Sequence, residues 1–201
     1  MNLFPTSYFP SITYFQEIYS CSNPAISGNE VYVKQSFRNR CEILTGNGIQ
    51  TLSVPVIKTE GSKTLSKDIR IVQNSSWKKD QWGAIKSAYQ NAPYFEFFDV
   101  EIHDLLFSKH DFLIDLNCSV LNFFAAVFGL STILVCEEPI EHEPSLTFLE
   151  RNHNCKEYIQ VFTDRYPFQS NLSILDLLFC EGPLGRNYIL TNYKDSLAWN
   201  Y

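Results

Sequence analysis

Residues 45–48 of this 201-residue chain read Thr-Gly-Asn-Gly, and no other stretch limits the possible folds as tightly. Tight turns that contain Asn and Gly join antiparallel strands, because these residue types tolerate the positive φ angles that such turns require. The flanking segments 31–44 and 49–57 have the patterns of extended chain. The sequence therefore predicts a β-hairpin near 38–57, which argues against an all-α fold.

The middle of the chain, about residues 80–130, has the periodicity of helices instead. Apolar side chains recur there every three or four residues, and Pro93 separates two of the predicted helices. Ser11 is the predicted N-cap of an earlier helix, and residues 171–180 predict a C-terminal helix. Short strands are predicted at 2–4, 68–72, 132–136 and 157–162. The pattern predicts an α/β or α+β fold with one mixed sheet, flanked by the helical middle region and the C-terminal helix.

Composition narrows the classes of protein to which the chain can belong. Its hydrophobic share of 45% and charged share of 19% are typical of a globular protein, and its length predicts a single domain spanning 1–201. The formal net charge of -6 disfavours nucleic acid as a partner. The longest apolar stretch, 112–135, is interrupted by Asp115, Asn117 and Asn122, so we expect no membrane span. The first residues lack the pattern of a signal peptide.

Neither the cysteines nor the histidines predict a metal or another cofactor. The cysteines are scattered without a Cys-x-x-Cys pair, so they predict reduced thiols in a cytoplasmic protein; they are Cys21, Cys41, Cys118, Cys136, Cys155 and Cys180. The acidic loop 137–144 includes His142, but its spacing matches no defined metal site.

A basic segment precedes the hairpin turn and is the first candidate site. Side chains alternate between faces along a strand, so one continuous strand would place Lys34, Arg38 and Arg40 on the same face. Three cations on one face can hold a phosphate or a carboxylate by charge-assisted hydrogen bonds. The alternative is a solvated, charged strand face, and a kink at residues 35–36 would separate the three side chains.

The loop at residues 4–11 is the second candidate. It leads into the helix predicted after Ser11, and the free N–H groups at the start of a helix attract anions. Ser7 and Tyr8 would donate hydrogen bonds to the same ligand. The alternative is a proline-shaped connection whose aromatic side chains simply pack.

Ser173 and Asp176 form a Ser-x-x-Asp pattern ahead of an apolar run. Such a pattern resembles a capping box, which favours a structural role for both residues. If Asp176 instead faces a pocket, it would act as a general base or bind a sugar hydroxyl.

Several motifs, in this order along nearly the whole chain, resemble the WbqC-like protein family. They are Tyr8-Phe9-Pro10, Tyr14-Phe15, Lys34, Arg38-Asn39-Arg40, Leu52-Ser53-Val54-Pro55-Val56, Tyr89, Ala92-Pro93-Tyr94-Phe95, Leu116-Asn117, the segment 172–179 and Gly182. The resemblance implies a cytoplasmic bacterial protein associated with surface-polysaccharide (O-antigen) assembly. Many relatives carry a His-Gln-Pro-like element before the first motif, whereas residues 4–7 here read Phe-Pro-Thr-Ser. A catalytic role for that histidine therefore does not transfer to this chain.

The resemblance also implies site residues, because Lys34, Asn39, Arg40 and Asp176 match its motif positions. The leading hypothesis is a transferase-like enzyme of glycan assembly that acts on a nucleotide-linked sugar or an activated acyl group. Substrate would bind at Ser7, Tyr8, Lys34, Arg38, Asn39 and Arg40, and Asp176 would supply a base or orient a hydroxyl. The second hypothesis is a non-catalytic accessory protein that binds a glycan-assembly enzyme or precursor. A third, single-strand nucleic-acid binding, conflicts with the acidic net charge.

Overall fold

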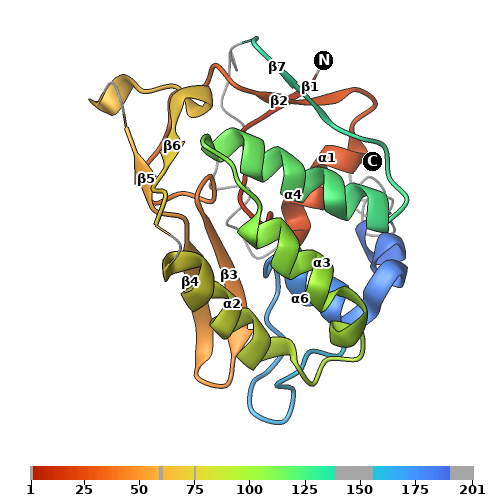
Figure 1. Ribbon diagram of the computed structural model, residues 1–201. Coiled ribbons are helices and arrows are strands. Elements are labelled where there is room, and N and C mark those ends of the chain that lie inside the picture. Colours follow the sequence, from red (N-terminus) through yellow and green to blue (C-terminus); the bar gives the residue numbers. More distant parts are fainter. Residues whose placement is uncertain (1, 59–60, 75, 139–155, 191–201) are drawn as a thin grey trace.

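A parallel sheet and the helices that connect its strands form one end of the structure. The computed structural model describes residues 2–58, 61–74, 76–138 and 156–190 (Figure 1). Strands β1 (Asn2–Phe4), β2 (Pro24–Ser27) and β7 (Leu134–Cys136) pair in the order β1-β2-β7, with both pairs parallel. Helix α1 (Ile12–Ser20) connects β1 to β2, and α4 (Leu113–Val127) immediately precedes β7. Parallel neighbours need such crossover connections, which are usually helical.

The predicted hairpin is confirmed. Strands β3 (Arg40–Thr45) and β4 (Gly48–Ser53) are antiparallel, with Thr45 opposite Gly48. Gly48 has a φ of 98°, in the left-handed region that favours glycine. Strands β5 (Val56–Ile57) and β6 (Arg70–Ile71) form a second antiparallel pair.

The mixed α and β class is therefore confirmed, but the expectation of one mixed sheet is wrong. The strands of the described residues lie in three small sheets. One reason is Pro55, which lies between β4 and β5 and has no N–H with which to continue a ladder. The carbonyl of Pro55 instead accepts a hydrogen bond from the Val72 amide after β6.

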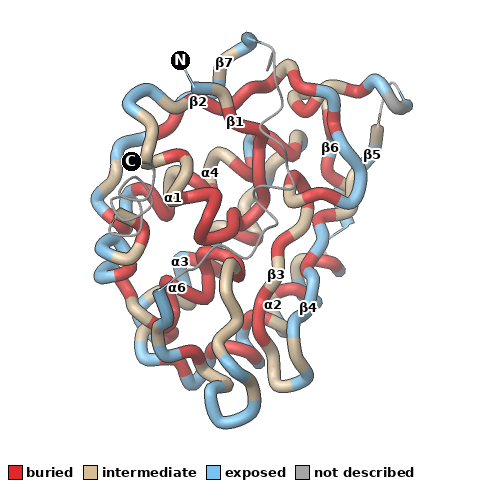
Figure 2. The backbone as a smooth tube through the Cα atoms, turned by 180° about the vertical axis from the view of Figure 1, so that it is seen from behind, coloured by how far each residue is buried: buried red, intermediate tan, exposed pale blue. Residues whose placement is uncertain are grey.

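The helical middle region and the C-terminal helix are confirmed. Helices α2 (Ser76–Tyr89) and α3 (Phe95–Phe107) pack on each other, α2 also covers β3, and α6 (Ile174–Glu181) contacts α1, α3 and β3. Short 3-10 turns lie at Gly61–Lys63, Ser66–Asp68 and Gly182–Leu184, and residues 185–190 are helical. Buried residues concentrate along α1, α4 and α6, while β4 is mostly exposed (Figure 2). Amphipathic faces thus enclose a common core.

Aromatic rings join the amino-terminal loop, α1 and α4 within this core. Phe124 of α4 lies edge-on to Phe9 and to Phe15, with 6.1 Å between ring centres in each pair. Such edge-to-face pairs each contribute about 0.5–1.5 kcal/mol beyond the burial of their area. The high aromatic content of the chain therefore serves packing here.

The loop before α1 is hydrogen-bonded to the start of α6. The Ile12 amide donates to the Leu172 carbonyl at 3.0 Å, and the Ile174 amide donates to the Pro10 carbonyl at 2.8 Å. The Ser173 hydroxyl donates to the Phe9 carbonyl at 2.9 Å and accepts from the Leu175 amide, so Ser173 caps α6 as predicted. Segments 160 residues apart in the chain thus lie side by side.

Replacing Ser173 with Ala should lower the free energy of unfolding by about 1–2 kcal/mol, because a helix cap and a buried hydrogen bond are lost together. Urea denaturation followed by circular dichroism measures this loss. Ser119→Ala is the matched control, because its hydroxyl bonds to the Asp115 carbonyl on an exposed helix face. A Ser173→Ala protein as stable as the Ser119→Ala protein would contradict the capping role.

One predicted strand is wrong in its first part and another is wrong throughout. The predicted segment 31–44 is a strand only from Arg40, because Val31 makes an isolated bridge to Leu65, residues 34–39 form turns and Gln35 has a φ of 55°. In the second, 157–162, the chain forms no strand and turns at 161–165. Residues 139–144 of the acidic loop lie outside the described residues.

No helix among the described residues combines the length and the apolar character that a bilayer crossing needs. No three His, Cys, Asp or Glu side chains of this part of the chain gather where they could hold a metal ion.

Candidate functional site

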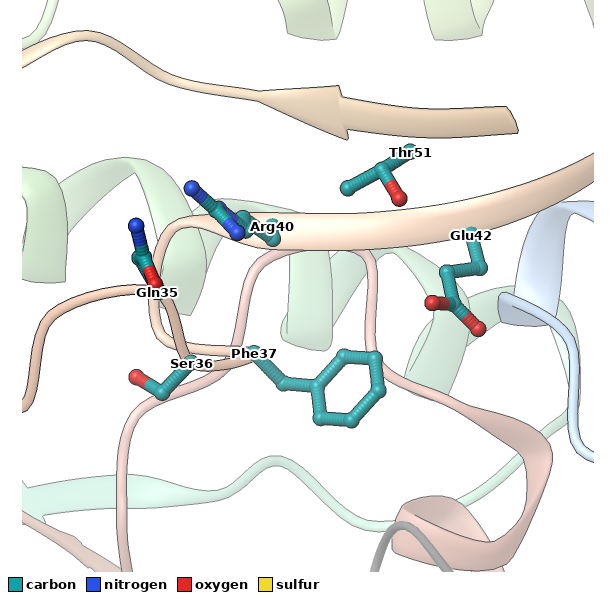
Figure 3. A pocket seen from close by; sticks show the side chains of 6 residues that line it. All are labelled: Gln35, Ser36, Phe37, Arg40, Glu42 and Thr51. Atoms are coloured by element: carbon teal, nitrogen blue, oxygen red, sulfur yellow. The ribbon is translucent and has the colours of Figure 1, made fainter.

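A cavity of about 270 Å³ lies between the hairpin and the turn that precedes it. It is lined by Gln35, Ser36, Phe37, Arg40, Glu42 and Thr51 (Figure 3). Arg40 and Glu42 are two positions apart on β3, and Thr51 is the cross-strand partner of Glu42. These three side chains therefore share one face of the hairpin, because side chains alternate along a strand. Cys41 and Ile43, which alternate with them on β3, are buried in the core. The polar face therefore points outward.

The opposite wall is the turn at residues 35–37. Gln35 adopts a φ of 55°, which is uncommon for a residue other than glycine and reverses the chain at this point. The guanidinium of Arg40 extends toward Gln35, whereas the carboxylate of Glu42 lies farther along β3 on the side of the Phe37 ring (Figure 3). The cavity therefore has a cation and a carboxylate at separate places, with an aromatic ring at its wall.

The Nε–H group of Arg40 has no hydrogen-bond partner among the described residues, although it is shielded from solvent. An unsatisfied buried donor costs about 1–3 kcal/mol, and more when it is charged. Nor does Arg40 form an ion pair with Glu42 within the described part of the chain. Because the Nε atom has almost no accessible surface, an acceptor in the cavity reaches it only if the Arg40 side chain shifts.

Arg38 does not share the Arg40 face, because it points into the interior. It forms a bidentate ion pair with Glu30, in which Nε lies 3.0 Å from Oε1 and Nη2 contacts Oε2. Both side chains are essentially unexposed. Glu30 also accepts from the Thr6 amide and the Ser66 hydroxyl. Burial raises the pKa of Glu30, and the hydrogen bonds and charge of Arg38 oppose that shift.

The ion pair supports the cavity wall from behind. The Arg38 backbone amide and its Nη1 lie 3.4 and 3.5 Å from the Ser36 hydroxyl, which in turn donates to the Val33 carbonyl. The Asn117 amide group donates to the Arg38 carbonyl at 2.8 Å. Arg38 therefore positions Ser36, which lines the cavity, while its own charge is already paired.

Ser7, Tyr8 and Asn39 also lie behind the cavity wall. The Ser7 hydroxyl and the Tyr8 amide both donate to the Phe37 carbonyl, at 3.3 and 2.8 Å. The Tyr8 hydroxyl donates to Gln81 on α2, and Tyr8 is fully buried. Asn39 is also buried and donates to the Val54 carbonyl. The alternative for this loop, in which its aromatic side chains pack, describes Tyr8 correctly.

Lys34 is exposed and directly precedes Gln35 of the cavity wall. The charge of Lys34 also acts on a second lysine, because desolvation and then Lys34 lower the pKa of Lys58. The Lys58 ammonium lies 4.8 Å from the ring centre of Tyr32. Lys34 and Lys58 thus both add positive charge beside the turn.

The structure thus separates the six predicted binding residues into three groups. Arg40 lines the cavity, Lys34 is exposed next to its wall, and the other four hold the wall in place from the interior. The prediction that Lys34, Arg38 and Arg40 share a strand face is wrong, because the kink at Gln35 interrupts the strand and Glu30 draws Arg38 inward. Substrate binding by these residues stays a prediction.

Sequence reasoning missed Glu42 and Thr51. Both could have been found from the turn at residues 45–48, because a two-residue turn sets the register that places Glu42 opposite Thr51. Nothing local in the sequence indicates that Gln35 and Phe37 face them.

Asp176 is fully buried in a second polar cluster, of which Tyr158 is half-buried. Its Oδ1 accepts from the Tyr89 hydroxyl at 3.0 Å, and its Oδ2 accepts from the Tyr158 hydroxyl and from Gln160 Nε2, the latter at 2.9 Å. Burial raises the pKa of Asp176, and the three donors partly offset this shift. The geometry matches a structural role, and a catalytic role for Asp176 stays a prediction.

The comparisons with known proteins agree with the resemblance seen in the motifs from Tyr8 to Asn117, while the segment 172–179 and Gly182 lie outside the matched residues. A sequence profile of the WbqC-like protein family matches residues 6–145, which include the whole cavity. A curated relative, "Uncharacterized protein Rv1507c" of Mycobacterium tuberculosis (strain ATCC 25618 / H37Rv), is 30% identical over 130 residues. That alignment covers 64% of this chain and 56% of the relative, so the chain spans little more than half of the relative's length. No solved structure matches the chain. Because the family profile covers well over half of its residues, the chain belongs to the WbqC-like protein family.

Proposed function

We propose that the protein is a transferase-like enzyme of bacterial surface-glycan assembly, acting in the cytoplasm on an anionic substrate. The substrate class is a nucleotide-linked sugar or an activated acyl group. One observation carries the proposal, namely a polar cavity whose wall includes Arg40, a cation that forms no ion pair within the described residues. Membership of the family supports the setting in glycan assembly.

In this proposal the cavity residues bind substrate and the residues behind them act by positioning. Arg40 holds the anionic group by charge-assisted hydrogen bonds, which are the stronger class of such bonds. Lys34 and Lys58 attract the rest of the substrate charge at the surface. Arg38, Asn39, Ser7 and Tyr8 keep the turn that forms the opposite wall in place, which limits the rearrangement that binding requires.

The candidate ligands are UDP-glucose, acetyl-CoA and inorganic pyrophosphate. Replacing Arg40 with Gln should weaken the binding of the one that stabilises the wild-type protein at least tenfold. The loss of one charge-assisted bond, about 1.5–3 kcal/mol, accounts for this factor. A thermal-shift screen finds the ligand, because a ligand at 100 times its Kd adds about 2.7 kcal/mol of stability. Isothermal titration calorimetry then compares the variants.

Arg165→Gln is the control, because Arg165 is mostly exposed and paired with its neighbour Asp164. Equal affinity of the Arg40→Gln and Arg165→Gln proteins would remove the cavity from the proposal, as would the absence of any stabilising anion.

A second candidate is the non-catalytic accessory protein. It is favoured by Phe97 and Val100, which lie three residues apart on α3 and are 69% and 61% exposed. Apolar side chains gathered on a surface often mark contacts with partner proteins. Complementation of surface-glycan synthesis in a deletion strain separates the candidates, because the Arg40→Gln protein fails if the cavity acts on substrate and succeeds if only α3 is needed.

A further inference from the structure

Resting on the proposed function, we propose that the cavity holds a single acidic monosaccharide unit, whose carboxylate pairs with Arg40 and whose hydroxyls donate to Glu42. The juxtaposition that carries this inference is a cation, a carboxylate and an aromatic ring in the wall of one small cavity. The inference adds the chemical class of the bound group to the proposed site.

The cavity has room for about one ring, and it is open to solvent on the side of the exposed Gln35 and Thr51. Pockets for drug-sized ligands span about 300–1,000 Å³, and this cavity of about 270 Å³ lies just below that range. A whole nucleotide-linked sugar does not fit within it. The remainder of such a substrate would lie outside the cavity, and the exposed Lys34 next to Gln35 offers a positive charge there.

Glu42 weakens the binding of a simple anion in the cavity. An ionised carboxylate only accepts hydrogen bonds, and within the described residues Glu42 pairs with neither Arg40 nor another cation. A phosphate or acetate held by Arg40 would experience repulsion from Glu42. A ligand that carries an anionic group at one place and hydroxyl donors at another satisfies both residues.

The rest of the lining matches the remaining surfaces of a sugar ring. Thr51, directly across the hairpin from Glu42, and Ser36 have hydroxyls that donate or accept, and Gln35 adds an amide. The Phe37 ring supplies an apolar wall for the C–H face of the sugar. Each lining residue thus has a matching part of one acidic pyranose.

The test measures binding of glucuronate, glucose, acetate, glycine and inorganic phosphate to the full chain by ligand-observed NMR titration. Glucuronate should bind at least tenfold more tightly than glucose or acetate, because neither of those occupies both ends of the cavity. Glu42→Gln should weaken the binding of glucuronate at least fivefold, because it removes an acceptor for the hydroxyls. It should leave the binding of acetate unchanged or make it tighter, because it removes a repulsive charge. Glu96→Gln, on the exposed face of α3, is the matched control.

The outcomes distinguish this inference from the proposed function. One outcome is that Arg40→Gln weakens the binding of phosphate or acetate while Glu42→Gln leaves the binding of glucuronate unchanged. In that case the anion site stands and the proposal of a bound monosaccharide is overturned. Glycine that binds as tightly as glucuronate overturns it too, because an ammonium would then be the partner of Glu42. If no anion shows binding that depends on Arg40, both proposals fail. Near-ultraviolet circular dichroism of each variant confirms that it is folded.

Discussion

Replacing Arg38 with Met should lower the free energy of unfolding by about 3–5 kcal/mol at pH 7. The substitution leaves Glu30 as an uncompensated charge in the interior, and removing one partner of a buried pair typically costs this much. The buried Ser66 hydroxyl and the Thr6 amide would still bond to Glu30, but neither neutralises it. Urea denaturation followed by tryptophan fluorescence measures the loss.

The deficit should depend on pH in a defined direction. Burial already raises the pKa of Glu30, and removal of Arg38 raises it further. An acid whose folded pKa exceeds its unfolded pKa binds more protons when folded, so stability falls as the pH rises between the two values. The Arg38→Met protein should therefore recover stability relative to wild type as the pH is lowered from 7 toward 5.

The double variant Glu30→Gln/Arg38→Met is the control, because it contains no buried charge at this position. It should be more stable than Arg38→Met alone at pH 7. A single variant that loses under 1 kcal/mol, or a deficit that does not change with pH, would show that Glu30 is solvated and that the pair is unimportant.

Replacing Asp176 with Ala should lower the free energy of unfolding by about 3–5 kcal/mol, an effect as large as that of Arg38→Met. The substitution leaves the Tyr89 and Tyr158 hydroxyls and the Gln160 amide without their acceptor, at about 1–3 kcal/mol each before water compensates. Chemical denaturation measures the total. Tyr158→Phe, which removes one of the three donors, should cost only about 1 kcal/mol.

A local measurement tests whether Asp176 acts through the segment before α6. Gln160 links the two, because its side-chain oxygen accepts from the Gln169 amide at 2.8 Å while its Nε2 donates to Asp176. Hydrogen exchange at the Gln169 amide should therefore accelerate in Asp176→Ala and stay slow in Ser119→Ala. An unchanged exchange rate together with a small loss of stability would contradict a structural role and would favour a chemical one.

Local chemistry made the hairpin and the caps predictable. The two-residue turn depends on residues 45–48 alone, and the N-cap roles of Ser11 and Ser173 depend on hydrogen bonds within one helical turn. In the segment 157–162, which was predicted to be a strand, the Tyr158 and Gln160 side chains both bond to Asp176. No neighbouring strand pairs with this described segment, so it forms no sheet.

The basic segment could not be interpreted without the tertiary structure. A sequence does not distinguish a solvated arginine from a buried, paired one, and the partners that bury Arg38 come from distant positions. Glu30 is eight residues away, while Thr6 and Ser66, which complete the cluster, lie 24 and 36 residues from Glu30. Arg40 was predicted as a site residue, and it does line the cavity. The strand that was expected to extend back to Lys34 begins only at Arg40.

The hydrogen bonds between the amino-terminal loop and the start of α6 affect how the protein folds as it is synthesised. A nascent chain that ends at residue 145 contains the whole segment matched by the family profile, but it lacks the carbonyl of Leu172 and the apolar face of α6. The rings of Tyr89 and Phe95 lack their Phe179 neighbour until α6 has been synthesised, about 2–7 s later at about 5–20 residues per second. During that interval the growing polypeptide presents aromatic surface to holding chaperones, and a message truncated before α6 would yield a product prone to aggregation.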